Sequence, residues 1–136
     1  MIYFVLIFGV VGLIFGTAPV TKDNIRTLAA EKTTFEVNKP FQQVFANMMS
    51  ASKQCYLYKH TREQMTVAGE KNNRDKTANI RIEHIYAMKP HEMYIMVDVK
   101  SLTDNKTQVD VYNKDESAKD SLKNYQIWAT KKPDKC

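Results

Sequence analysis

The chain has 136 residues, of which 43% are hydrophobic and 26% are charged, with a formal net charge of +5. Acidic residues interrupt nearly every basic cluster, so the charge predicts an ordinary solvated surface and no nucleic-acid partner. The mild exception is the C-terminal tail at Lys131, Lys132 and Lys135, where a membrane surface or an acidic partner is the alternative.

The first segment, residues 1–20, carries no charge and is almost entirely apolar. A helix rises about 1.5 Å per residue, so this length reaches about 30 Å, the thickness of a hydrocarbon core. We expect an uncleaved transmembrane anchor, because no basic residue precedes the apolar run and Pro19 fits poorly after a cleavage site. The alternatives are a signal peptide cleaved near Ala18, which would leave a secreted or periplasmic protein, and a buried core helix.

The orientation of this anchor is set by two opposing signals. Lys22, Arg26 and Lys32 follow the apolar segment, and positive charges beside a span favour the cytoplasmic side. Long domains translocate largely regardless of charge, and the two cysteines suit an oxidising compartment. We therefore expect a bacterial inner-membrane protein whose domain faces the periplasm.

Residues 21–32 form a helical or linker segment, and residues 33–136 form one α+β domain. Thr21 can cap a helix over residues 22–31, and residues 33–37 alternate as a short strand. An amphipathic helix is expected over residues 40–54, with Pro40 in its first turn. Its apolar stripe has three-, four- and seven-residue spacings and contains Phe41, Val44, Phe45, Met48 and Cys55.

After residue 55 the hydrophobic period changes from 3.6 to 2, which predicts strands over 56–59, 65–69, 78–87, 92–100 and 108–113. A final helix begins at Asp115 or Ser117 and ends near Thr130, with Leu122, Tyr125 and Ala129 facing inward. This order predicts an antiparallel sheet of about five strands, with the N-proximal and C-terminal helices on one face.

The two cysteines are Cys55, on the core side of its helix, and Cys136, the last residue. A chain end is normally frayed, so a thiol there is useful mainly when it is tied down. We expect a disulfide between them; the alternative is a buried Cys55 thiol and a free Cys136. The sequence contains no CxxC or HxxxH spacing that would indicate a metal site.

The stretch Phe35-Glu36-Val37-Asn38-Lys39-Pro40-Phe41-Gln42-Gln43-Val44-Phe45 resembles the opening strand and helix of helix-grip proteins, the group that includes START domains and plant pollen allergens. The domain also resembles small uncharacterised bacterial envelope lipoproteins, which end in a tryptophan-containing helix and a terminal cysteine, as Trp128 and Cys136 do here. The second resemblance implies that a transmembrane anchor replaces a lipid anchor in this chain.

The residue types that carry catalysis form no recognisable arrangement. His60, His84 and His91 have no partner at helix or strand spacing, so we expect structural or solvated histidines. The serines lack a glycine-flanked nucleophile turn, and the few glycines form no phosphate-binding loop. We therefore expect no enzyme, no cofactor and no metal; a hydrolase whose site assembles only in space is the least favoured hypothesis.

Apolar residues on both faces of the 92–100 strand indicate that each face is covered. Met93, Ile95, Val97 and Val99 are expected on one face of this strand, and Tyr94 and Met96 on the other. Tyr94 and Met96, with Tyr86, form a candidate interaction face, covered by the first helix, a partner, a ligand or nothing. The leading hypothesis is a membrane-anchored, non-catalytic binding or structural module with an envelope protein as partner. The alternative is a carrier or sensor whose apolar ligand is lined by Phe41, Phe45, Tyr125 and Trp128.

Overall fold

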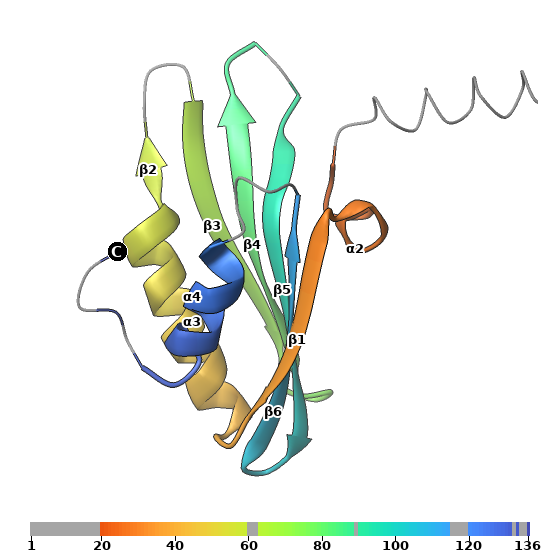
Figure 1. The fold of residues 1–136 in the computed structure, drawn as a ribbon, viewed down its shortest axis with the longest axis vertical. Coiled ribbons are helices and arrows are strands. Elements are labelled where there is room, and N and C mark those ends of the chain that lie inside the picture. Colours follow the sequence, from red (N-terminus) through yellow and green to blue (C-terminus); the bar gives the residue numbers. More distant parts are fainter. Residues whose placement is uncertain (1–19, 60–62, 89, 115–119, 132, 134–135) are drawn as a thin grey trace, which may run out of the picture.

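The computed structural model describes residues 20–59, 63–88, 90–114, 120–131, 133 and 136. The predicted anchor over residues 1–20 lies outside this part of the chain except for Val20, and no helix among the described residues has the length and apolarity of a membrane span. The described residues form one antiparallel sheet with helices packed on it, so the predicted α+β class is confirmed (Figure 1).

The sheet has six strands in the order β1-β6-β5-β4-β3-β2, and every neighbouring pair is antiparallel. The strands are β1 (Glu31–Val37), β2 (Tyr58–Lys59), β3 (Glu63–Asn72), β4 (Thr77–Tyr86), β5 (Glu92–Thr103) and β6 (Lys106–Asn113). Strands β3 to β6 follow one another as hairpins. Strand β1, from the N-terminal part of the sequence, pairs with β6 at one edge of the sheet. Tight turns between neighbours account for this order.

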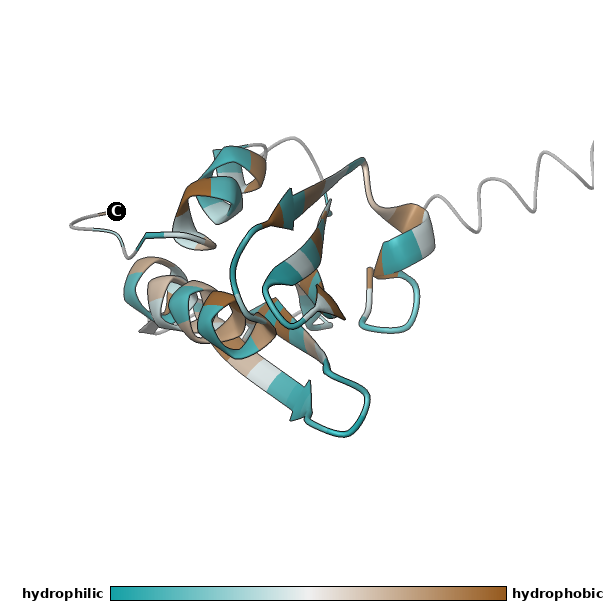
Figure 2. Cartoon of the chain, turned by 90° about the horizontal axis from the view of Figure 1, so that it is seen from below, coloured by the Kyte–Doolittle hydropathy of each residue, from teal (hydrophilic) through white to brown (hydrophobic). Residues whose placement is uncertain are grey.

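The described residues also form three helices: α2 (Ile25–Leu28), α3 (Phe41–Tyr56) and α4 (Asp120–Trp128). Helices α3 and α4 cover one face of the sheet, which we call the inner face, and α2 covers part of the other, the outer face (Figure 2). The predicted placement of two helices on one face is thus confirmed. The expected start of α4 at Asp115 or Ser117 lies outside the described residues.

The inner face carries the main hydrophobic core. Helix α3 buries Phe41, Val44, Met48 and Ala51 at three- and four-residue spacings, the periodicity of an amphipathic helix. The strands contribute fully buried aliphatic residues, namely Ile80, Ile82, Ile95, Val97, Val109 and Val111. Pro40, predicted at the first helical position, is instead the N-cap residue of α3, with an extended backbone, and β1 has already ended at Val37.

The outer face is covered by residues 20–30, which form a shorter helix than the sequence predicts. Helix α2 is a single turn, because Ala29 is already extended and β1 begins at Glu31. Ile25 is fully buried against Met93, Met96 and Tyr112. The N-proximal segment is therefore docked on the sheet.

A β-bulge in β5 changes which residues face inward. Ile82 pairs with Ile95, but the next residue of β4 pairs with Met93, so Tyr94 is the extra residue. A bulge reverses the alternation of the side chains beyond it. Tyr94 consequently packs with the inner core and Met93 with the outer cluster, so the predicted faces of both residues are wrong. Met96 does lie opposite Ile95, as predicted.

Cys55 and Cys136 form a disulfide, with their Cα atoms 5.4 Å apart and 81 positions apart in sequence. The bond joins the last turn of α3 to the chain end that follows α4 (Figure 1). The predicted pairing is confirmed. It ties the chain end that follows α4 to the C-terminal turn of α3.

Candidate functional site

The four residues predicted to line a ligand site all lie between the helices and the inner face. Phe41 and Trp128 are 5% exposed, Tyr125 is fully buried, and Phe45 is partly buried. The Tyr125 and Trp128 rings meet edge to face at 5.0 Å between centroids. Tyr56 joins them, at 5.8 Å from the Trp128 ring.

The buried hydroxyl groups of this aromatic cluster are hydrogen-bonded. Ser52 Oγ donates its only proton to the Met48 carbonyl oxygen at 2.7 Å. The Tyr125 hydroxyl, 2.7 Å from the same Ser52 oxygen, must therefore be the donor to it. Burial raises the pKa of Tyr125 well above its usual range. These side chains fill the space beneath α4, so their arrangement is that of a packed core.

Of the three residues predicted as an interaction face, Tyr86 and Tyr94 both lie against the His84 ring, with centroids at 4.2 and 6.3 Å, whereas Met96 lies on the other face of the sheet. Met96 is fully buried beneath α2 on the outer face, whereas Tyr94 packs on the inner core. Tyr86 forms a hydrogen bond between its hydroxyl and His84 Nδ1 at 2.8 Å. The bulge at Tyr94 places Tyr94 and Met96 on opposite faces, and no periodicity in the sequence could reveal it.

The described histidines are engaged with ordinary neighbours. His84 lies against Tyr86, with ring centroids 4.2 Å apart. His91 Nδ1 is 3.6 Å from a Glu83 carboxylate oxygen, and both side chains are largely exposed. His60 lies outside the described residues. Within the described ranges no three His, Cys, Asp or Glu side chains are grouped to hold a metal ion.

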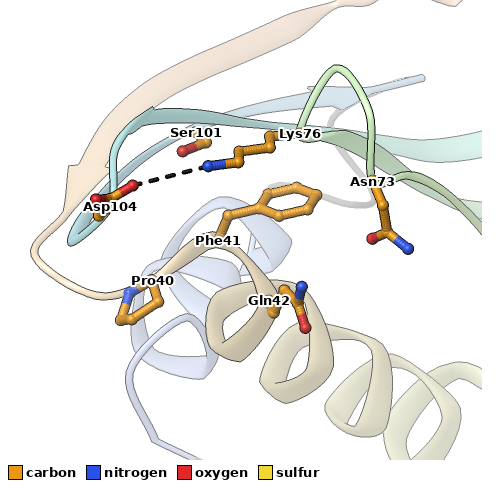
Figure 3. Close-up of a pocket in the computed structure, with 7 residues that line it drawn as sticks. All are labelled: Pro40, Phe41, Gln42, Asn73, Lys76, Ser101 and Asp104. Atoms are coloured by element: carbon orange, nitrogen blue, oxygen red, sulfur yellow. Dashed lines mark ion pairs between the residues drawn. The ribbon is translucent and has the colours of Figure 1, made fainter.

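A hollow of about 360 Å³ lies where the start of α3 meets two hairpin turns (Figure 3). Its lining consists of Pro40, Phe41, Gln42, Asn73, Lys76, Ser101 and Asp104. Lys76 Nζ lies 3.7 Å from Asp104 Oδ1, so the one cation and the one anion of the lining face each other. The hollow also presents the side-chain amides of Gln42 and Asn73 and the Ser101 hydroxyl, which donates to the Thr103 carbonyl oxygen at 3.1 Å.

This hollow was not predictable from the sequence because two separate turns build it. Lys76 adopts a positive φ of 52°, and its carbonyl oxygen accepts a hydrogen bond from Ser101 N at 3.0 Å. Asn72 Oδ1 accepts from the backbone N–H groups of Arg74 and Asp75, which fixes the β3–β4 turn. The residues Asn72 and Asn73 predict the turn, but not that it meets the β5–β6 turn.

The described residues define a class: a small, disulfide-linked α+β domain with hollows between its helices and strands. No family model matches the chain. No curated protein matches it significantly either. The function must therefore be argued from the geometry.

Proposed function

We propose that this chain is a non-catalytic binding or structural module, held on the periplasmic side of a bacterial inner membrane by its N-terminal apolar segment. The observation that carries the proposal is the docking of residues 20–30 on the outer face. Val20, the last residue of the apolar stretch, accepts a hydrogen bond through its carbonyl oxygen from Met93 N at 2.8 Å. A membrane segment that ends there would be joined to the domain without a flexible linker.

The side chains that follow Val20 support a fixed orientation. Ile25 is fully buried, and Arg26 makes two hydrogen bonds to the Asp98 carboxylate, at 2.7 and 2.8 Å. The end of the sheet near Met93 would then face the bilayer. Met88, in the turn after β4 at this end, is 94% exposed, and an apolar side chain there suits a lipid surface. The hollow of Figure 3 would face away from the membrane.

The disulfide supports the choice of compartment. Disulfides persist in oxidising spaces such as the bacterial periplasm and are rare in the cytosol. The bond between Cys55 and Cys136 closes a loop over most of the domain. A domain stabilised in this way suits a structural or binding role outside the cytoplasm.

The proposal is tested by labelling thiols in intact cells. Free thiols are blocked with a membrane-permeant alkylating reagent, membranes are washed with alkaline carbonate, and the protein is analysed by mass spectrometry without reduction. We expect an intact N-terminus, retention in the membrane fraction and unlabelled Cys55 and Cys136. Labelled thiols, or release of a shortened chain by carbonate, would contradict it.

A single added cysteine reports the orientation separately. Lys123 is exposed on α4, so the thiol of Lys123→Cys should react with a membrane-impermeant maleimide in spheroplasts. Reaction only after lysis would place the domain on the cytoplasmic side and overturn the proposed localisation. The unmodified chain, treated identically, is the control.

A further inference from the structure

Among the described residues, no strand pairs with residues 66–72 of β3 on the side away from β4, so this stretch is an edge of the described sheet. In the described part of the chain, β2 pairs with β3 only at Met65 and Gln64. Every second residue of an edge strand directs its N–H and C=O groups away from the sheet, where another strand can pair with them. This part of β3 therefore offers unused backbone donors and acceptors.

A groove of about 460 Å³ runs beside this edge, between β3 and α3. It is lined by Gln42, Phe45, Ala46, Met49, Ser50, Lys53 and Lys71. Gly69 of β3 allows the helix to approach, because a Cβ there would lie 2.8 Å from Met49 Sδ and 3.2 Å from Phe45 Cζ. The two helix side chains thus lie against the backbone of the strand and form an apolar floor.

The spacing of the helix side chains matches that of a strand. Phe45, Met49 and Lys53 are each four residues apart on α3, which is about 6.0 Å along a helix. Side chains on one face of a strand recur every two residues, or about 6.6 Å. Successive same-face side chains of a strand added to β3 would therefore each meet one of these helix residues.

The charged side chains that line the groove are all positive. Lys53 and Lys71 are its only charged lining residues, both are exposed, and neither forms an ion pair with a described residue. The neighbouring acid, Glu70, pairs instead with Arg81 at 3.2 Å and Lys22 at 3.7 Å. An incoming segment with acidic side chains would find complementary charge at this groove.

The opposite edge of the sheet, β1, offers a less selective surface. Its groove against α4 is lined by both Glu36 and Lys39. Glu36 is already paired with Lys106 at 2.9 Å. Charge therefore distinguishes the two edges and favours β3 for an acidic segment.

We propose that an extended acidic peptide segment of a partner protein binds by adding to β3 as a new edge strand. Its backbone pairs with residues 66–72, two apolar side chains rest on Phe45 and Met49, and flanking carboxylates meet Lys53 and Lys71. This inference rests on the proposed binding function and names the chemistry of its partner.

The test uses the full-length chain in lipid nanodiscs and a fluorescent peptide of sequence DTVTVTD. This sequence reads the same in both directions, so it offers the acid, apolar, apolar, acid pattern to the groove in either strand orientation. The charge-reversed peptide KTVTVTK is the comparison. We expect saturable binding of the acidic peptide, and binding of the basic peptide about tenfold weaker.

Charge reversal of the groove should exchange this preference. In the double variant Lys53→Glu with Lys71→Glu, we expect binding of DTVTVTD to fall about tenfold and binding of KTVTVTK to rise. The matched control is Lys100→Glu with Lys123→Glu, two exposed lysines outside the groove lining, which should leave the preference for the acidic peptide intact. Amide hydrogen exchange should slow in residues 66–72 and remain unchanged in β1.

Three results would overturn the inference: no saturable binding of DTVTVTD, equal binding of the two peptides, or protection of β1 instead of β3. The alternative occupant of this edge is a second copy of the chain, which sedimentation of the peptide-free chain would detect as a dimer. A dimer that the Lys53→Glu, Lys71→Glu variant abolishes would assign the edge to a second copy. The thiol-labelling test uses no peptide, so failure here leaves the anchoring and compartment of the proposed function to be judged separately.

Discussion

The two faces of the sheet are closed by different means. The inner face is covered by two helices, a continuous aliphatic and aromatic core and a disulfide. The outer face is covered by one helical turn, with Ile25 as its buried anchor and charged pairs such as Arg26–Asp98 around it. Apolar burial stabilises in proportion to area, whereas exposed ion pairs contribute little. The inner face therefore holds the domain together, and the outer face positions its N-proximal segment.

The largest expected loss comes from removing the disulfide. In the Cys55→Ser, Cys136→Ser variant, the crosslink across an 81-residue separation no longer restricts the unfolded chain, and the chain-entropy model gives a loss of about 4.5 kcal/mol. Urea unfolding of the variant and of the oxidised chain measures the difference. The native chain with a reductant is the control and should match the variant. A loss below about 1 kcal/mol would show that the inner core alone closes that face.

A matched pair of isoleucines compares the faces directly. Ile95 and Ile25 are both fully buried, the first in the inner cluster and the second in the outer one. Truncation to alanine costs about 2–5 kcal/mol in a core that cannot collapse. We expect Ile95→Ala to cost about 4 kcal/mol and Ile25→Ala about 2 kcal/mol. The one-turn helix α2 can undock from the sheet, so the cost of Ile25→Ala cannot exceed the free energy of that docking.

Amide hydrogen exchange distinguishes local undocking of α2 from destabilisation of the whole sheet. Ile25→Ala should speed exchange at the amides of Met93 and Ala30, which donate to Val20 and Asn113, and leave the inner strands protected. Ile95→Ala should weaken protection throughout the sheet. Equal losses of stability and the same pattern of exchange would mean that the two faces unfold as one unit, contrary to the comparison.

Alkaline pH should loosen the inner face through its tyrosines. Burial raises the pKa of Tyr56 to about 12, above the usual value of about 10 for an unfolded chain. The folded state thus favours the protonated phenol, so its contribution is complete below pH 10 and is lost as pH rises from about 10 to 12. Unfolding measured across this range should show the decline, and Tyr56→Phe should reduce it. An unchanged decline in that variant would assign the effect to other groups.

Periodicity predicted much of the fold because local packing decides it. The stripe of Phe41, Val44 and Met48 fixes α3, and alternation fixes the strands whose inner residues are aliphatic. The bulge at Tyr94 was not predictable, since it depends on how β5 pairs with β4. The candidate grooves were also missed, because each requires a turn or a free edge to lie beside a helix. Gly69 was the one local signal, a glycine inside a strand that marks a close approach.

The smallest expected effect is that of the outer-face ion pair. Arg26→Gln removes the guanidinium that holds Asp98, which is also the cross-strand neighbour of Asp110. Because Arg26 is 44% exposed, we expect a loss of about 1 kcal/mol or less. The loss should shrink toward about 1 M NaCl, where the Debye length falls to about 3 Å and salt screens both the lost attraction and the new repulsion between the carboxylates.

The matched control is Lys106→Gln, which breaks the exposed ion pair with Glu36. It should cost less stability because Lys106 makes one contact to its carboxylate, whereas Arg26 makes two. A loss above about 2 kcal/mol that salt does not reduce would mean that this pair acts as a buried anchor. The outer face would then be held as firmly as the inner one, and the N-proximal segment would belong to the core rather than lie docked upon it.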